Sequence, residues 1–202
     1  MTNAQSRVYI ARLTGIATFD PNGDQVGKVR DVVVTLRSGN QPPRVLGLVI
    51  EVPPRRRIFV PITRVTSIDP GAVLITGLLN MRRFEQRQGE VLVVGELLDR
   101  KVKLLEDNSD VLVEDVAMEF TRTRDWLVTR VHIMRQPSGL RRRGATLTVD
   151  WNEVTGFSII ESDQGVSNLL ATIASLRAAD LARSEEHTSE LQSRVDISYA
   201  VF

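Results

Sequence analysis

Short apolar runs separated by turn-forming residues dominate the sequence between residues 8 and 160. The runs are rich in valine, isoleucine and leucine, and clusters of Gly, Pro, Asn and Asp interrupt them about every ten residues. Such a pattern is typical of β-strands in small barrels or sandwiches and leaves no room for long helices. Strands are therefore predicted near residues 15–19, 26–36, 44–52, 57–60, 72–76, 91–94, 101–105, 111–121, 126–135, 146–149 and 154–159.

The segment Asp20-Pro21-Asn22-Gly23-Asp24 carries the strongest turn signal, because its Asn-Gly pair accepts positive φ. Its polar residues also occupy positions 1, 3 and 5 of a calcium-loop template, with Asp31 at position 12. Gln25 stands where that template requires glycine, and the flanks have strand character. We therefore predict a hairpin turn here and no calcium site.

An internal repeat relates the two parts of this strand-rich region. Leu13 and Leu97 are 84 positions apart, as are Asp31 and Asp115, which lie in the similar phrases Val-Arg-Asp-Val and Val-Glu-Asp-Val. Each copy then has a long strand, an arginine-rich loop, another strand and a Val-Thr pair. Two tandem small β-barrel domains are predicted, over residues 1–87 and 88–161.

Two arginine triplets are the candidate binding residues. They are Arg55, Arg56 and Arg57 in the first copy and Arg141, Arg142 and Arg143 in the second. Guanidinium groups bind phosphates in bidentate fashion, so both loops are candidate anion or RNA contacts, although a solvated loop explains them equally well. The low net charge of +1 and the lack of interleaved aromatic residues do not favour nucleic acid as the partner.

Composition limits the chemistry available to the chain. The 202 residues include no cysteine and two histidines, which excludes disulfides, thiolate nucleophiles and cysteine-built metal sites. The longest apolar run, Val45–Ile50, is far shorter than the roughly 18 to 20 residues that span a bilayer, so no membrane insertion is predicted. The polar N-terminus resembles no signal peptide, and a cytoplasmic location is predicted.

No catalytic or metal-binding constellation emerges from the motifs. His132 alternates with Val131 and Ile133 on a strand, so a partly exposed structural histidine is favoured over a general base. Trp126 and Trp151 are predicted to pack in the core or at a barrel mouth. Asp150 and Glu153 could form a carboxylate pair, but their spacing alone does not bring them together. The chain is therefore predicted not to be an enzyme.

The sequence changes character after residue 161. Leu169, Ile173 and Leu176 follow helical spacing, which predicts an amphipathic helix over 162–182 that must dock on another surface. Residues 183–202 are similar to the in-frame translation of a sequencing adapter, and we expect them to be an artefact. Setting them aside removes two arginines and four acidic residues, which leaves a charge near +3 and predicts a truncated chain.

The first copy resembles a PRC-barrel domain. The resemblance rests on Leu13-Thr14-Gly15-Ile16, on the turn and strand from Asp20 to Val34, and on the strand Arg57–Ile62 that ends at a proline. The second copy departs from this pattern, since Ser109 replaces the turn glycine and Leu112 replaces Gly27. The resemblance implies tandem small PRC-like β-barrels, a mainly β fold, followed by a C-terminal α-helix.

Residues 7–182 as a whole resemble the N-terminal region of cytoplasmic bacterial proteins in which PRC-like barrels precede an MgtE-type N domain and CBS domains. The segment Leu176–Ala182 is similar to the start of that N domain. The resemblance implies a non-catalytic regulatory module whose partner is another protein or the chain's own missing C-terminal domains. It implies no cofactor within this fragment, and Mg²⁺ only for the missing downstream region. The alternative is an RNA- or ribosome-associated adaptor like the ribosome maturation factor RimM, which also contains a PRC barrel.

Overall fold

The computed structural model describes residues 7–135 and 144–157. The chain divides into two units, residues 1–160 and 161–202, and the second unit lies entirely outside the described residues. The predicted helix over 162–182, the adapter-like segment and Arg141–Arg143 therefore lie outside them as well. All of the described residues belong to the first unit.

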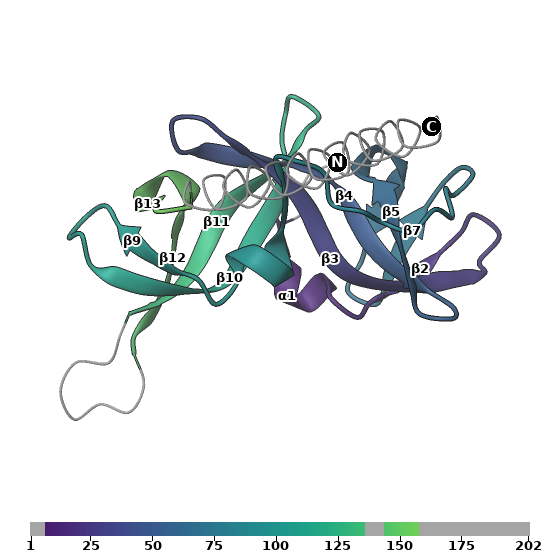
Figure 1. Ribbon diagram of the computed structural model, residues 1–202, viewed down its shortest axis with the longest axis horizontal. Coiled ribbons are helices and arrows are strands. Elements are labelled where there is room, and N and C mark those ends of the chain that lie inside the picture. Colours follow the sequence, from purple (N-terminus) through teal and green to yellow (C-terminus); the bar gives the residue numbers. More distant parts are fainter. Residues whose placement is uncertain (1–6, 136–143, 158–202) are drawn as a thin grey trace, which may run out of the picture. The chain divides into compact units, whose positions relative to one another are not determined.

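The described residues form a mainly β structure, which confirms the mainly β part of the predicted fold class (Figure 1). The elements of the first half of the sequence are β1 Arg7–Tyr9, α1 Ile10–Leu13, β2 Ala17–Phe19, β3 Gln25–Arg37, β4 Gln41–Val52, β5 Arg56–Pro61, η1 Ile62–Arg64, β6 Val65–Ile68 and β7 Ala72–Ile75. Those of the second half are β8 Glu90–Leu92, η2 Val93–Leu97, β9 Lys101–Leu104, β10 Asp110–Phe120, β11 Trp126–Arg135, β12 Thr146–Asp150, η3 Trp151–Glu153 and β13 Val154–Thr155. None of the helices in this part of the chain could cross a membrane.

The strands join one mixed sheet of 13 strands. Its main path runs β13-β9-β10-β11-β4-β3-β2-β7-β6, while β1 and β12 branch off the second half and β5 and β8 branch off the first. The pair β2 and β7 is parallel and the other pairs are antiparallel. Long strands with alternating or continuous valine and isoleucine supply the apolar residues that fill the core.

Backbone hydrogen bonds repeat between the two halves. The Gly15 N–H donates to Val29 O at 2.8 Å, and 84 residues later the Asp99 N–H donates to Val113 O at the same distance. Both donors have positive φ, 89° for Gly15 and 60° for Asp99. The register breaks in β3 and β10 also correspond, since each strand bulges one residue before its aspartate, Asp31 or Asp115. The offset seen in the sequence thus corresponds to equivalent backbone positions.

Each half gives its first strand and helical turn to the other. Strand β1 pairs with β10, and β8 makes the equivalent pairing with β3. Turn α1 spans four residues and η2 spans five, so the repeat offset increases by one residue there. Ile10 and Leu13 of α1 and Val93 and Leu97 of η2 are fully or almost fully buried. Burying a side chain of this size contributes about 2 kcal/mol, so each exchanged turn is firmly anchored.

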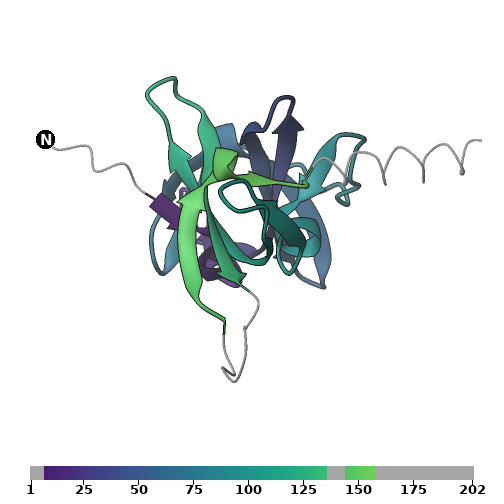
Figure 2. The same cartoon turned by 90° about the vertical axis from the view of Figure 1, so that its left-hand side faces the viewer.

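The halves also join where β4 meets β11. Leu127 pairs with Arg44, and the repeat places these two residues at equivalent positions. An ion pair of 2.7 Å from Arg44 Nη2 to Asp125 Oδ1 lies beside this pairing. Figure 2 shows the second half of the sheet, in teal and green, facing the viewer. The pairing across equivalent residues is the arrangement expected for two copies related by an approximate two-fold axis.

Two local predictions from the sequence need correction. The run Val91–Val94 was expected to be a strand, but the strand ends at Leu92 and Val93 opens a π-helical turn. The reason is tertiary, because the Asp31 carboxylate accepts hydrogen bonds from Val94 N and Gly95 N and so stabilises the turn. Strand β6 was not expected, because its residues Val65–Ile68 are mixed in polarity.

Candidate functional site

A row of charged side chains crosses three neighbouring strands of the first half. Lys28 on β3 pairs with Glu51 on β4, and Glu51 pairs with Arg57 on β5. Directly paired residues on adjacent antiparallel strands project to the same side of the sheet. Arg30 joins the row through a 2.8 Å hydrogen bond from Nη2 to Glu51 Oε1. We call Lys28, Arg30, Glu51, Arg55 and Arg57 the basic face.

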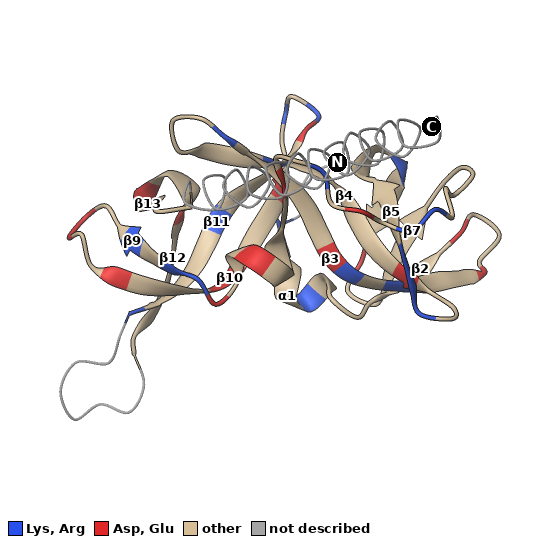
Figure 3. Cartoon of the chain, viewed as in Figure 1, with Lys and Arg blue, Asp and Glu red and all other residues tan. Residues whose placement is uncertain are grey.

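Glu51 is the carboxylate of the basic face, and its pKa shows that the cations lie close to it. Its pKa is held below the ordinary value, first by the hydrogen bond from Arg30 and then by the charges of Arg30, Arg57 and Arg55. Four cations against one carboxylate leave this face strongly positive, whereas the whole chain has a net charge of only +1. In Figure 3 blue segments on β3 lie near those at the turn between β4 and β5.

The structure places Arg55 and Arg57 of the first predicted triplet on this face, whereas Arg56 pairs with buried Val52 and projects to the other side of the sheet. Arg55 lies in the turn between β4 and β5, and Arg56 and Arg57 begin β5. All three are exposed, and within the described part of the chain none of them lies within 4.0 Å of a carboxylate oxygen. Arg55 adopts φ 77°, a left-handed conformation that glycine or asparagine adopts at lower cost. The second triplet, Arg141–Arg143, falls in the range 136–143, outside the described residues.

An aromatic pair adjoins the basic face. Phe59 lies two residues after Arg57 on β5, and its ring stacks on that of Phe84 with centroids 6.1 Å apart and planes inclined by 24°. The Phe84 N–H donates to Arg57 O at 2.8 Å, which fixes the segment before β8 alongside β5. Both rings are partly exposed. The sequence showed no aromatic residues interleaved with the triplet, and folding supplies them.

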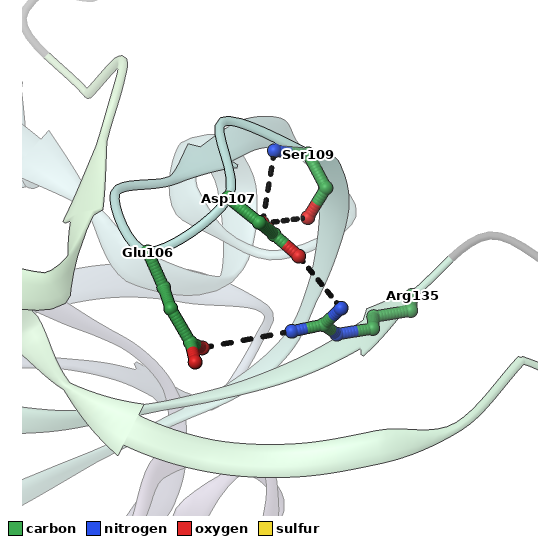
Figure 4. Close-up of polar contacts among 4 residues, drawn as sticks. All are labelled: Glu106, Asp107, Ser109 and Arg135. Atoms are coloured by element: carbon green, nitrogen blue, oxygen red, sulfur yellow. Dashed lines mark hydrogen bonds and ion pairs between the residues drawn. The ribbon is translucent and has the colours of Figure 1, made fainter.

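The second half has no such face at the equivalent described positions. Leu112, Met134 and Thr146 form the row that corresponds to Lys28, Glu51 and Arg57. The nearby Arg135 is neutralised, as Figure 4 shows: its guanidinium lies 2.8 Å from Asp107 Oδ2 and 3.8 Å from Glu106 Oε2. Because the second half folds without this row of charges, the basic face is not a requirement of the fold.

His132 lies in a polar row on the surface of the second half. Its Nδ1 is 2.9 Å from Thr148 Oγ1, and its Nε2 is 3.5 Å from Glu114 Oε2. The side chain is 33% exposed, while Val131 and Ile133 are buried, as the alternation predicted. A hydroxyl, an imidazole and a carboxylate in sequence resemble a nucleophile arrangement. The three side chains come from the neighbouring strands β10, β11 and β12.

The remaining candidate residues serve local structure. Asp20 Oδ1 accepts hydrogen bonds from Asn22 N and Asp24 N, both 2.9 Å, which confirms the predicted turn. Asp150 and Glu153 form a capping box around η3, with Asp150 N donating to Glu153 Oε2 at 2.9 Å. Among the described residues no group of three or more His, Cys, Asp or Glu side chains could hold a metal ion.

The tryptophans behave as packing residues. Trp151 is 2% exposed and stacks on Phe157 with centroids 4.2 Å apart, which confirms the predicted core position. Trp126 packs on Phe120 next to the turn of the β10–β11 hairpin, with centroids 5.5 Å apart.

Sequence reasoning missed Lys28, Arg30, Phe59 and Phe84 as members of the candidate site. Two local signals were available, the alternation Arg57-Ile58-Phe59 on a predicted strand and the tripeptide Arg82-Arg83-Phe84. Neither signal places residue 84 beside residue 57, which requires the tertiary structure.

Residues 91–159 match the family described as Actinomycetes SH3 domain. This match covers the second half of the described structure and is a similarity of that part alone. A search of curated proteins finds no match to the chain.

Proposed function

We propose that the chain is a non-catalytic interaction and regulatory module built from two copies of one small β-domain. The observation that carries this proposal is the reciprocal exchange of β1–α1 and β8–η2, which makes one scaffold from two equivalent halves. One of those halves is similar to an SH3 domain family. The repeated hydrogen bonds support assigning residues 7–76 as a second copy of the same domain.

The resemblance of the sequence to PRC-barrel proteins gives this proposal its more specific form. In that form the chain contributes tandem PRC-like barrels and a C-terminal helix to a cytoplasmic protein with an MgtE-type N domain and CBS domains. Its partner is another protein or those domains of its own chain, and Mg²⁺ acts only on the downstream region. The resemblance assigns no cofactor to residues 1–182.

Sequencing the source DNA across the codon of Ala182 tests this form directly. Continuation into an acidic, helical segment and CBS domains is the expected result. Calorimetric titration of the extended protein with MgCl₂ would then give binding that the present chain lacks. Recovery of the codons for residues 183–202 from genomic DNA, or an extended protein that does not bind Mg²⁺, would refute the regulatory assignment.

A second candidate function is an RNA- or ribosome-associated adaptor, and the basic face favours it. Arg55, Arg56 and Arg57 are exposed and lie next to an aromatic pair, a combination that suits nucleic acid. Fluorescence anisotropy with labelled total RNA at increasing KCl tests the candidate. Binding that weakens steeply with salt is expected, because each neutralised phosphate releases counterions. Absence of binding at 20 mM KCl would eliminate it.

A further inference from the structure

We propose that the basic face and the Phe59–Phe84 pair together form a binding site for single-stranded nucleic acid, located on the first half. This inference rests on the second candidate function and defines its site and ligand class.

The cations are arranged to follow a phosphate backbone. Lys28 and Arg57 flank Glu51 on neighbouring strands, which lie roughly 4.8 Å apart in a sheet. Arg30 already occupies the Glu51 carboxylate, so Lys28, Arg55 and Arg57 remain for an outside anion. Two further exposed arginines, Arg82 and Arg83, directly precede Phe84. Several guanidinium groups on one surface suit successive phosphates better than a single small anion.

The aromatic pair indicates that bases are bound as well as phosphates. The Phe59 ring lies across Gly47, since a Cβ atom placed on Gly47 would come within 2.7 Å of that ring. Phe84 stacks on the other side of Phe59 and remains partly exposed. An exposed aromatic ring beside arginines is the usual platform for stacking an unpaired base. The carboxylates of an acidic peptide carry no aromatic plane to stack on this ring, whereas every nucleobase does.

Sheet geometry favours a single strand over a duplex. The basic face spans β3, β4 and β5, and a sheet surface bearing aromatic rings presents bases with a plane on which to stack. Duplexes are instead read by elements that enter a groove, such as a helix or a two-stranded ribbon. The basic face is a broad sheet surface and projects no such element.

The second half strengthens the inference by providing an internal comparison. Its equivalent row is Leu112, Met134 and Thr146, and Thr148 stands where Phe59 stands in the first half. The two copies share the same strand pairing. The first copy carries cations and an aromatic pair, and the equivalent described positions of the second copy carry neither. A purely structural origin of the basic face would predict similar residues in both copies.

The test uses the full chain and fluorescein-labelled 12-mers of uridine, deoxythymidine and a matched RNA duplex, measured by anisotropy between 20 and 300 mM KCl. We expect both single strands to bind and the duplex to bind at least tenfold more weakly. The Lys28→Gln/Arg57→Gln double variant should weaken binding at least tenfold and reduce the slope of log K against log salt by about 1.4. The matched control, Lys101→Gln/Arg122→Gln, removes two exposed charges from the second half and should bind like the wild type.

The aromatic contribution is tested by Phe84→Leu, which keeps an apolar side chain against Phe59 but removes the stacking plane. We expect about tenfold weaker binding with an unchanged salt slope. Circular dichroism verifies that each variant is folded. A comparison of the oligouridine and oligodeoxythymidine affinities distinguishes RNA from single-stranded DNA as the ligand.

Four outcomes would overturn the inference: no binding of either single strand at 20 mM KCl, equal binding of the duplex, normal binding by the Lys28→Gln/Arg57→Gln variant, or full binding by Phe84→Leu together with equally tight binding of polyglutamate. The last result would identify an acidic protein as the partner. If RNA binds but the Lys28→Gln/Arg57→Gln variant binds normally, the adaptor function survives and the proposed site fails. If neither single strand binds, both fail.

Discussion

Asp31 and Asp115 occupy equivalent positions in the two halves, and each carboxylate holds the helical turn that comes from the other half. Asp31 accepts hydrogen bonds from Val94 N at 2.8 Å and Gly95 N at 3.0 Å, and Asp115 accepts one from Ala11 N at 3.0 Å. Each aspartate also accepts the N–H of its own next residue. The two aspartates therefore fasten the exchanged segments in a reciprocal manner.

Asp31→Asn should lower the free energy of unfolding by about 1–3 kcal/mol, because an amide nitrogen would then face the Gly95 N–H. Asp115→Asn should cost less, since Asp115 is less buried than Asp31. Urea denaturation followed by circular dichroism measures both values. The control is Asp24→Asn in an exposed turn, for which we expect a change below about 0.5 kcal/mol. Equal stabilities of Asp31→Asn and the wild type would show that the carboxylate does not hold the turn.

The same aspartate predicts a distinctive pH dependence. Burial raises the pKa of the Asp31 carboxyl above its ordinary value of 3.8, and the backbone hydrogen bonds offset this in part. The folded state therefore binds the proton more readily than the unfolded state does. Protonation of Asp31 thus favours folding, an effect that is complete below the unfolded pKa and disappears as the pH rises through the folded pKa.

The stability difference between the wild type and Asp31→Asn should accordingly grow as the pH falls from 7 to 4. Urea midpoints and slopes at pH 7, 5.5 and 4 give this difference, in which carboxylates common to both proteins, such as Glu51, cancel. Burial raises the pKa of Asp115 in the same direction, so Asp31→Asn/Asp115→Asn should show a larger pH effect. A difference that shrinks toward pH 4 would contradict the assignment.

Local sequence patterns were sufficient to predict most strands but not the exchange between halves. The alternation of apolar residues placed β3, β4, β10 and β11 correctly, because burial imposes a period of two on a strand. The 84-residue offset between Asp31 and Asp115 was also visible in the sequence. Nothing local indicates that Val94 and Gly95 would meet Asp31, since that contact depends on which copy each turn packs against.

The candidate site could be predicted only in part for the same reason. Arg55–Arg57 were identifiable as exposed cations from their position between two predicted strands. Lys28 and Phe84 join them through cross-strand pairing and through a backbone hydrogen bond to Arg57. These contacts link residues more than 20 positions apart and become visible only in the folded chain.

Gly47→Ala should destabilise the protein by about 1–3 kcal/mol or more. A Cβ atom at this position would collide with Val60 O and lie 2.7 Å from the Phe59 ring. The ring would have to move and would disturb its stacking on Phe84. Gly71→Ala is the control, because a Cβ atom there meets nothing within 4 Å and the backbone has no positive φ. Thermal unfolding checks both, and equal melting temperatures for the two variants would refute the close packing at Gly47.

Ile10→Ala tests whether the two halves unfold together. Ile10 belongs to the first half in sequence, but its turn α1 packs against β10 of the second, and its side chain is fully buried. Loss of this side chain should cost about 2–5 kcal/mol. Both tryptophans, Trp126 and Trp151, lie in the second half, so tryptophan fluorescence reports on that half while circular dichroism reports on all strands.

Because the exchanged segments tie the halves to each other, the fluorescence and dichroism transitions of Ile10→Ala should coincide and shift together to lower urea concentration. Leu78→Ala serves as the control, since Leu78 is 90% exposed and its removal should leave both transitions unchanged. A fluorescence transition that stays at the wild-type midpoint while the dichroism transition moves would mean that the second half folds independently. The reciprocal contacts made by Asp31 and Asp115 would then contribute little to the coupling between the halves, and the module would behave as two separate domains.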